Sequence, residues 1–366
     1  MNPLVELIAY GQSFWYDNIR RKFLHDGTLK NLIDHDGLRG MTSNPAIFEQ
    51  AIGKSDDYDE QIRQLAQQGA DINAIYEALA LADIQAACDL FAHLYQESKG
   101  GDGYVSLEVS PHLANDTAST VTEARRLRQA VGRPNVMIKV PATPEGIPAI
   151  EQLIGEGINI NITLMFSLAH YEAVADAYIK GVQKLAEQGG DVRQIASVAS
   201  FFVSRVDSAV DKKLAELNDA AATELLGKTA IANCKIVYQR YQELFYGPAF
   251  ADLLEKGAPT QRLLWASTST KNPSYPDTIY VDNLIGPETV NTMPPATVDA
   301  FRDHGTLEMT LTDNIVEAWL VLDNLAELGI DLDAITEQLQ VDGVAAFSKS
   351  FETLMAAIAA KRERLL

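Results

Sequence analysis

The chain has 366 residues, of which 47% are hydrophobic and 22% are charged, which is the composition of an ordinary globular protein. Its formal net charge of −20 argues against nucleic acid as a partner, because that contact relies on clustered lysine and arginine. No apolar stretch approaches the length of a membrane span, and segment 1–10 lacks the basic start and cleavage site of a signal peptide, so we expect no membrane partner.

Short apolar runs alternate along the chain with longer segments of helical periodicity. Segments 146–155, 169–187 and 204–217 carry apolar residues at helical spacing. Eight strands alternating with helices predict an α/β fold of the (β/α)8 TIM barrel type, with a doubly wound sheet as the competing architecture. The predicted strands are 12–17, 38–42, 104–108, 135–140, 158–163, 195–200, 262–267 and 278–281.

The spacing between these strands is uneven, which predicts extra helices around the barrel. Helical insertions are expected at about 50–100 and 218–247, and further helices at about 311–366. No stretch rich in Pro, Gly or Ser divides the chain. We therefore expect one barrel domain over 1–366.

Lys139 interrupts an otherwise apolar strand, 135–140, that ends at Pro141. Lysine is rarely buried unless it is paired or reactive, and burial disfavours its ammonium form. A neutral amine in such a place can form a Schiff base with a carbonyl substrate. The alternative is a lysine at a strand end whose head group reaches water.

Polar residues recur where the predicted strands end, and residues two apart share one face of a strand. Active sites of such barrels are built at the carboxyl ends of the strands. Single polar residues there are commonly turn residues, but similar placement on seven strands favours a site. The residues concerned are Asp17, Thr42, Asn44, Ser106, Glu108, Lys139, Asn161, Thr163, Ser200, Ser267 and Ser269.

Schiff-base chemistry at Lys139 suggests roles for three of these residues. Glu108 is a candidate acid/base for imine formation, and Thr163 a candidate for holding a water. Asp17, on another strand, could take the proton of a departing hydroxyl. The alternatives are an N-cap role for Asp17 and a salt bridge at the rim for Glu108.

Two basic residues near strand ends are candidates for binding an anion. Arg205 stands at the start of a predicted helix, where its guanidinium could grip a phosphate. Lys271 lies in the loop after the seventh strand, a common phosphate site in these barrels. Taken singly, each could also be a solvated residue balancing acidic neighbours.

Histidine and cysteine show no metal pattern. The six histidines have no HxH or HExxH spacing, so no zinc site is expected, and neither a dinucleotide fingerprint nor a P-loop occurs. Cys88 and Cys234 are far apart and resemble small core residues, which favours a reducing cytoplasm.

Taken together, the motifs resemble the transaldolase family, specifically its longer variant, over nearly the whole chain. The lysine strand with its Pro-Ala-Thr tail, followed by the Asn-x-Thr strand of Asn161 and Thr163, is specific as a pair. The stretches that carry the resemblance are 14–21, 40–48, 105–109, 135–143, 157–167, 265–273 and 285–294.

The resemblance implies residue roles. It implies that Lys139 forms the Schiff base, that Asp17 handles the C4 hydroxyl proton, and that Glu108 and Thr163 position a catalytic water. It also implies that Arg205 binds phosphate. Residues that would bind the dihydroxyacetone part or support the lysine are Thr42, Asn44, Ser106, Asn161 and Ser200.

One position departs from the shorter members of the family, in which a Ser-x-Arg binds phosphate after the seventh strand. Here the same place reads Ser267-Thr268-Ser269, and we expect Lys271 with nearby backbone amides to take over.

The implied reaction is transfer of a dihydroxyacetone unit between ketose and aldose phosphates, with no cofactor and no metal. The alternatives are a class I aldolase that releases dihydroxyacetone or its phosphate, and a non-catalytic barrel that binds sugar phosphates. The expected partners are sugar phosphates, and the sequence is compatible with a homo-oligomer.

Overall fold

The computed structural model describes residues 2–366. Met1, the first residue of the expected domain 1–366 and of segment 1–10, lies outside the described residues. Within residues 2–366, eight parallel strands form one sheet that closes on itself, with β1 paired to both β2 and β8. The predicted (β/α)8 barrel is therefore confirmed. The strands are β1 Gln12–Asp17, β2 Gly40–Thr42, β3 Tyr104–Glu108, β4 Val136–Pro141, β5 Ile160–Met165, β6 Ser197–Phe202, β7 Arg262–Ala266 and β8 Thr289–Met293.

The predicted eighth strand, 278–281, is wrong. Ile279–Asp282 is the one-turn helix α14, which begins where the Thr278 hydroxyl donates to Asp282 Oδ2. The true β8, Thr289–Met293, is buried along its whole length although it carries Thr289, Asn291 and Thr292. These polar side chains find partners inside the barrel, as Asn291 does by accepting from Thr268 at 2.9 Å, and so the strand lacks a plain apolar pattern.

Helices connect the strands on the outside of the barrel, with additional helices after β2, β6 and β8. Several begin at an Asp or Ser whose side chain accepts from the backbone three residues later, such as Asp71 from Ala74. Among residues 2–366 we find no helix whose length and apolarity would carry it across a bilayer. The α-helices are α1 Pro3–Glu6, α2 Arg21–His25, α3 Thr28–His35, α4 Pro45–Phe48, α5 Asp59–Gln67, α6 Ile72–Glu97, α7 Thr117–Val131, α8 Gly146–Gly155, α9 Leu168–Glu187, α10 Ser204–Leu217, α11 Ala220–Glu224, α12 Thr229–Phe245, α13 Ala251–Glu255, α14 Ile279–Asp282, α15 Pro295–His304, α16 Ile315–Glu327 and α17 Leu332–Leu365. The shorter helical turns are η1 Leu7–Tyr10, η2 Glu49–Gly53, η3 Pro111–Leu113 and η4 Val192–Gln194.

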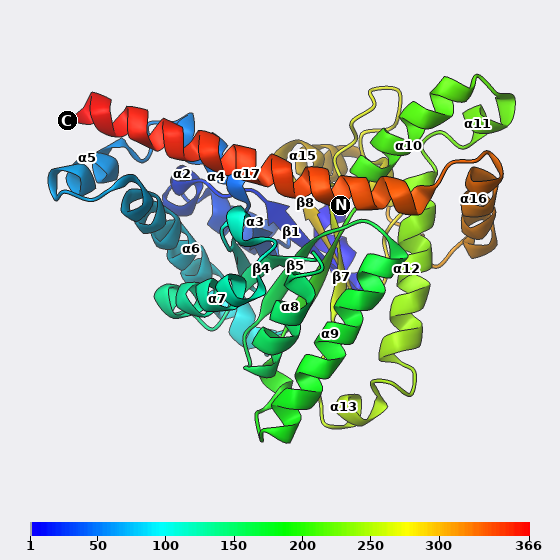
Figure 1. The fold of residues 1–366 in the computed structure, drawn as a ribbon, viewed down its shortest axis with the longest axis horizontal. Helices are drawn as coiled ribbons and strands as arrows, with labels where there is room; N and C mark the ends of the chain where they lie inside the picture. Colours follow the sequence, from blue (N-terminus) through cyan, green and yellow to red (C-terminus); the bar gives the residue numbers. More distant parts are fainter. Residues whose placement is uncertain (1) are drawn as a thin grey trace.

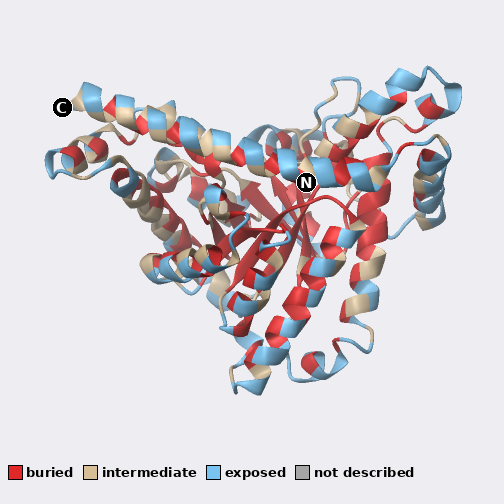
Figure 2. Ribbon diagram, in the orientation of Figure 1, coloured by how far each residue is buried: buried red, intermediate tan, exposed pale blue. Residues whose placement is uncertain are grey.

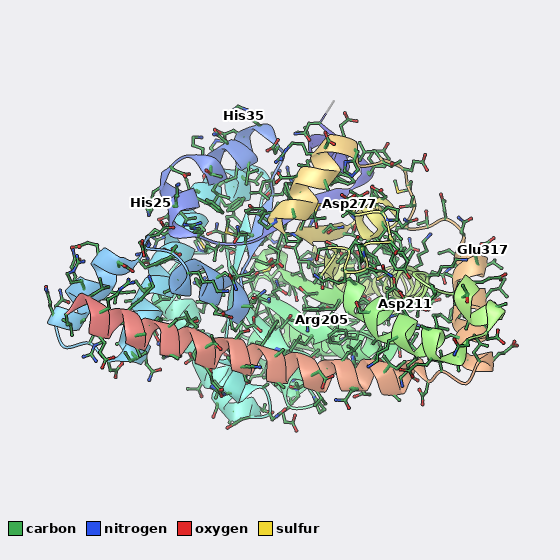
Figure 3. All side chains as sticks on the ribbon, turned by 90° about the horizontal axis from the view of Figure 1, so that it is seen from above. His25, His35, Arg205, Asp211, Asp277 and Glu317 are labelled. Carbon is green, nitrogen blue, oxygen red and sulfur yellow. The ribbon has the colours of Figure 1, made fainter. Side chains whose placement is uncertain are left out.

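The strands and the inner faces of the surrounding helices form the buried interior, while the outer helix faces are exposed (Figure 2). The long helix α17, Leu332–Leu365, runs across the molecule on one side of the barrel (Figures 1 and 3). It packs against α10 near its start and against α4, η2 and α5 toward its end. Near that end, Lys361 Nζ donates to Asp59 Oδ1 at 2.6 Å, which ties α17 to α5.

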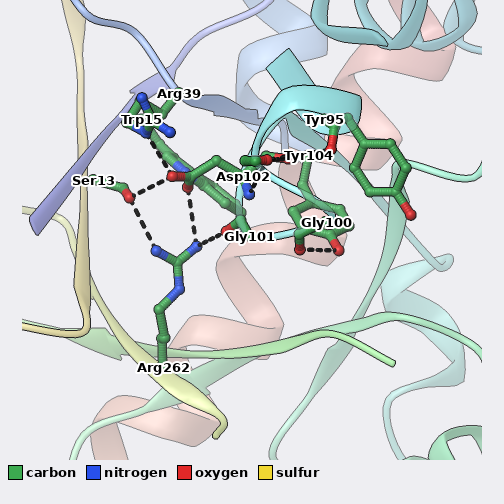
Figure 4. A network of polar contacts seen from close by, with 10 residues as sticks. Ser13, Trp15, Arg39, Tyr95, Gly100, Gly101, Asp102, Tyr104 and Arg262 are labelled. Carbon is green, nitrogen blue, oxygen red and sulfur yellow. Dashed lines mark hydrogen bonds and ion pairs between the residues drawn. The ribbon is translucent and has the colours of Figure 1, made fainter. Parts of the chain in front are cut away.

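A buried ion-pair network joins the amino ends of several strands (Figure 4). Asp102, just before β3, accepts at Oδ2 from Arg39 Nε at 2.5 Å and at Oδ1 from Arg262 Nη2 at 3.0 Å. Ser13 on β1 also donates to Asp102 at 3.0 Å and accepts from Arg262 at 2.9 Å. Asp102 is buried, with 4% of its surface exposed, so its charge is neutralised by partners rather than by water.

Candidate active site

Strand register places the key side chains side by side on the inner face of the barrel. Glu108 on β3 is level with Lys139 on β4, which is level with Asn161 on β5. Likewise, Asp17 on β1 is level with Thr42 on β2. Since partners in parallel strands point the same way, these residues converge at the carboxyl end of the barrel.

Lys139 is enclosed by the barrel, with 5% of its surface exposed. Its Nζ donates to the carbonyl oxygen of Ser43 at 3.1 Å and lies 3.6 Å from Glu108 Oε2. The alternative in which this lysine extends its head group to water is therefore wrong. An amine held among protein groups with a carboxylate nearby has the setting of a Schiff-base nucleophile.

Burial raises the pKa of the Glu108 carboxyl, although the nearby Lys139 opposes the rise. Burial also raises the pKa of Asp17, against the opposing effects of Lys139 and of the hydrogen bond that Thr42 donates at 2.7 Å. Asp17 does not cap a helix, because α2 begins only at Arg21 and Asp17 is bonded to Thr42. Carboxyl groups with raised pKa values are suited to giving and taking protons near neutral pH.

A cavity of about 220 Å³, called here the central cavity, opens at this end of the barrel. Most of the predicted site residues line it. The lining residues are Asp17, Thr42, Asn44, Lys139, Thr163, Ser200, Phe202, Arg205, Ala266, Ser267, Ser269, Lys271, Thr292, Pro294 and Phe347.

Ser106 and Asn161 do not line the central cavity but lie beneath its floor. Asn161 donates to Ser106 Oγ at 3.0 Å and accepts from Ser200 Oγ at 2.6 Å. This chain of hydrogen bonds fixes the side chains next to Lys139. The geometry gives Ser106 and Asn161 a supporting position, and leaves Ser200 as the member that reaches the cavity.

Two polar atoms near the amine lack partners among residues 2–366. Glu108 Oε2 and Thr163 Oγ1 are buried without a hydrogen bond. Buried polar atoms are nearly always satisfied in folded proteins, so unsatisfied ones in a cleft mark places where a ligand or water can bind. Glu108 does not line the central cavity but borders a neighbouring cavity of about 320 Å³, which is also lined by Tyr76, His112 and Phe351.

Arg205 and Lys271 also line the central cavity. The guanidinium carbon of Arg205 lies 5.2 Å from the centre of the Phe202 ring, which holds it in place beside α17 (Figure 3). Burial lowers the pKa of Lys271, and the neighbouring Arg205 lowers it further. Within residues 2–366 neither cation is paired with a carboxylate at salt-bridge distance, so both are available to an anion.

Sequence reasoning missed Phe202, Thr292, Pro294 and Phe347. Thr292 was missed because the eighth strand was predicted at the wrong place. Assigning β8 to the polar segment Thr289–Met293 would have put Thr292 at the carboxyl end of a strand. Phe347 comes from α17, and no local pattern relates it to the barrel strands.

Among the described residues, no group of three or more His, Cys, Asp or Glu side chains is arranged to hold a metal ion.

A closed eight-stranded barrel that encloses a lysine and two carboxyl groups at the carboxyl ends of its strands is the arrangement of the class of aldolase-like barrels. A profile described as Transaldolase/Fructose-6-phosphate aldolase matches residues 14–358, and the chain belongs to that family.

Similarity to individual proteins covers the full length. The chain is 49% identical to a transaldolase of Thiobacillus denitrificans over 98% of this chain and 100% of that protein. It is 47% identical to a transaldolase of Trichodesmium erythraeum, over 100% of this chain and 98% of the relative. A transaldolase of Frankia alni is 48% identical over 98% of this chain and 97% of its own. The resemblance seen in the sequence is confirmed, and the function of the chain is that of a transaldolase.

Proposed function

We propose that Lys139 is the nucleophile of a transaldolase that moves a dihydroxyacetone unit between sugar phosphates. The observation that carries this proposal is the enclosed amine of Lys139, 3.6 Å from Glu108, at the floor of the central cavity. The amine attacks C2 of a ketose phosphate such as fructose 6-phosphate or sedoheptulose 7-phosphate. Glu108 passes protons as the resulting carbinolamine loses water to become an iminium ion, and Thr163 helps to hold that water.

Asp17 then removes the proton of the C4 hydroxyl, and the C3–C4 bond breaks. The bonding electrons move into the iminium group and give an enamine on Lys139, while an aldose phosphate departs. A second aldose, erythrose 4-phosphate or glyceraldehyde 3-phosphate, accepts the enamine carbon at its aldehyde, and Asp17 returns the proton to the new C4 oxygen. Water finally hydrolyses the iminium ion and frees the new ketose and Lys139.

The anionic end of the substrate would bind Arg205 and Lys271. Both line the central cavity and carry charge that no carboxylate within the described residues pairs with at salt-bridge distance. In a chain with a formal net charge of −20, such local positive charge is what an anionic substrate requires. Ser267 and Ser269 supply further hydroxyl groups at the same end.

Transfer rather than simple cleavage is supported by full-length similarity to transaldolases. Analysis of products with and without an acceptor aldose tests this part of the proposal. A transferase makes a new ketose phosphate only when the acceptor is present, whereas a simple aldolase releases dihydroxyacetone at the same rate in both cases.

Borohydride reduction in the presence of fructose 6-phosphate tests the nucleophile. We expect a stable adduct on the peptide that contains Lys139 and none in Lys139→Met. Lys235 is a matched internal control, because it too is buried but donates to the carbonyl oxygens of Thr310 and Asp313 outside the cavity. An adduct on another lysine, or none at all, would remove Lys139 from its role.

Asp17 is tested in the same assay, because it acts after the imine has formed. Asp17→Ala should still be trapped by borohydride while its kcat falls about 10²–10⁴-fold. Retained turnover in this variant would contradict the assignment.

We also propose that 1–366 works as one domain, which is supported by a single large core cluster that includes residues from Leu4 to Ile358.

A location in a reducing cytoplasm is supported by two buried cysteines that are free. The strongly acidic charge supports a protein without nucleic-acid partners. Assembly into a homo-oligomer is tested by sedimentation equilibrium.

A further inference from the structure

The backbone of β5 is irregular next to Thr163. Between Ile162 and Met165, the register with β6 shifts so that Thr163 and Leu164 together oppose Ser200 alone. Leu164 adopts a left-handed conformation with φ 60°, which is unfavourable for a leucine. Such a bulge redirects the side chains beside it, and here the side chain beside it is the Thr163 hydroxyl at the central cavity.

The bulge is held from outside the barrel by Gln340 on α17. The Nε2 group of Gln340 donates to the carbonyl oxygen of Leu164 at 2.9 Å and to that of Ala142 at 2.9 Å. Gln340 is buried, with 5% of its surface exposed. Ala142 in turn donates its N–H to the carbonyl oxygen of Thr163 at 2.7 Å, so one amide group ties together the ends of the lysine strand and the threonine strand.

The next turn of α17 is fitted to the same bulge. A Cβ atom at Gly343 would lie 2.8 Å from Leu164 Cδ2 and 3.7 Å from Arg205 Nη1, so a larger residue there would make the Leu164 side chain shift. One further turn along, Phe347 lines the central cavity. Gln340, Gly343 and Phe347 therefore form one face of α17, which is turned toward the site.

We propose that Gln340 is a positioning residue for Thr163. By holding the Leu164 carbonyl, it keeps the bulge in the form that aims Thr163 Oγ1 into the central cavity, and through it governs the imine-forming and imine-hydrolysing steps at Lys139. This inference rests on the proposed role of Thr163 and extends it to a residue that does not touch the substrate.

The test uses the full-length enzyme with Gln340→Met, which keeps the size of the side chain but removes both donors. A small displacement of Thr163 should lower kcat and the rate of borohydride trapping about tenfold, with KM changed less than about twofold. Gln338→Met is the matched control, because Gln338 lies on the same helix but is exposed and donates only to Asp342. It should behave as the wild type does.

A double-mutant cycle separates positioning from a general structural role. If Gln340 acts through Thr163, then adding Gln340→Met to Thr163→Val should slow the enzyme by less than about twofold further. An undiminished tenfold loss in the Thr163→Val background, or wild-type rates in Gln340→Met, would overturn the inference while leaving the proposed function intact. Wild-type rates in Thr163→Val would instead remove Thr163 from the mechanism, and the inference with it.

If Gln340→Met does not fold, the cycle is run with Gln340→Asn, which keeps the amide but shortens its reach. Thermal unfolding of every variant is measured in parallel. The positioning role requires that Gln340→Asn lose kcat in the wild-type background and little in the Thr163→Val background, and additive losses would contradict it.

Discussion

The two ends of the barrel treat buried charge in opposite ways. At the amino end, both oxygens of Asp102 are bonded to arginines, and Ser13 and Trp15 also donate to this carboxylate (Figure 4). At the carboxyl end, Glu108 stands 3.6 Å from Lys139, and its Oε2 has no hydrogen-bond partner among residues 2–366. We call the amino end, where both carboxylate oxygens are bonded, the matched end, and the carboxyl end, where within the described chain Glu108 has only a longer ion pair with Lys139, the unmatched end. The matched end supports the fold, whereas the unmatched end keeps groups available for chemistry.

Removing the carboxylate at the matched end should give the largest effect. Asp102→Ala leaves the half-buried Arg39 and Arg262 without their partner, and we expect the free energy of unfolding to fall by about 3–5 kcal/mol. The kcat per folded molecule should be unchanged, because Asp102 lies at the other end of the barrel from the central cavity. Urea unfolding and active-site titration measure the two quantities.

A matched control is Asp176→Ala, whose pair with Lys180 lies on the exposed face of α9. This variant should leave the free energy of unfolding nearly unchanged, because exposed pairs add little. A similar small change in Asp102→Ala would show that the network at the amino end is not a structural support.

Glu108→Gln tests the unmatched end, with a smaller effect of a different kind. We expect kcat to fall about 10²–10³-fold, because the amide cannot pass protons during imine formation. The free energy of unfolding should not fall, because burial already disfavours the charged carboxylate and raises its pKa. Steady-state kinetics together with urea unfolding decide the matter, and a loss of stability without loss of kcat would reverse the comparison.

Asp207 on α10 is a third buried carboxyl group, with hydrogen bonds but no cationic partner in the described part of the chain. Its replacement should give the smallest of these effects. Burial raises its pKa to about 6, and it accepts only from neutral groups, Ala230 N at 2.7 Å and the Tyr280 hydroxyl at 2.9 Å. A raised carboxyl pKa means that the folded protein holds a proton that the unfolded chain releases near its ordinary pKa of 3.8. The contribution to stability is therefore complete below that pH and is lost as the pH rises to about 6.

Asp207→Asn should remove this dependence. From pH 4 to pH 7, the wild type should lose roughly 2–3 kcal/mol of unfolding free energy that the variant keeps. Urea unfolding across this pH range measures the difference. Parallel curves for the two proteins would mean that Asp207 is charged in the folded state over the whole range.

The inner strands were predictable because their chemistry is local. An apolar run with one lysine, as at Val136–Pro141, identifies both a buried strand and a reactive group from a few residues. Alternation along the strand also places Ser106 and Glu108 on one face. In the structure, Glu108 is level with Lys139, and Ser106 accepts a hydrogen bond from Asn161. Strand ends were less well placed, since β5 and β6 extend two residues beyond their predicted ends.

What sequence reasoning could not reach depends on contacts between distant segments. Thr289–Met293 is a buried strand although its sequence is polar, because hydrogen bonds to residues outside the strand, such as the one that Thr268 donates to Asn291, allow its burial. The floor position of Asn161 follows from bonds to Ser106 and Ser200, which single-strand patterns do not reveal. Phe347 and Gln340 lie on α17, and the periodicity of a helix does not identify the part of the protein against which it packs.

The order of elements along the chain has a consequence for biosynthesis. All eight barrel strands precede α17, so a nascent polypeptide can complete its sheet while Gln340 and Phe347 are still inside the ribosome. Such an intermediate would possess Lys139, Glu108 and Asp17 yet lack the helix that contributes Phe347 to the central cavity and supports the bulge. Catalytic competence would then arrive as a late event of maturation, after the sheet has closed.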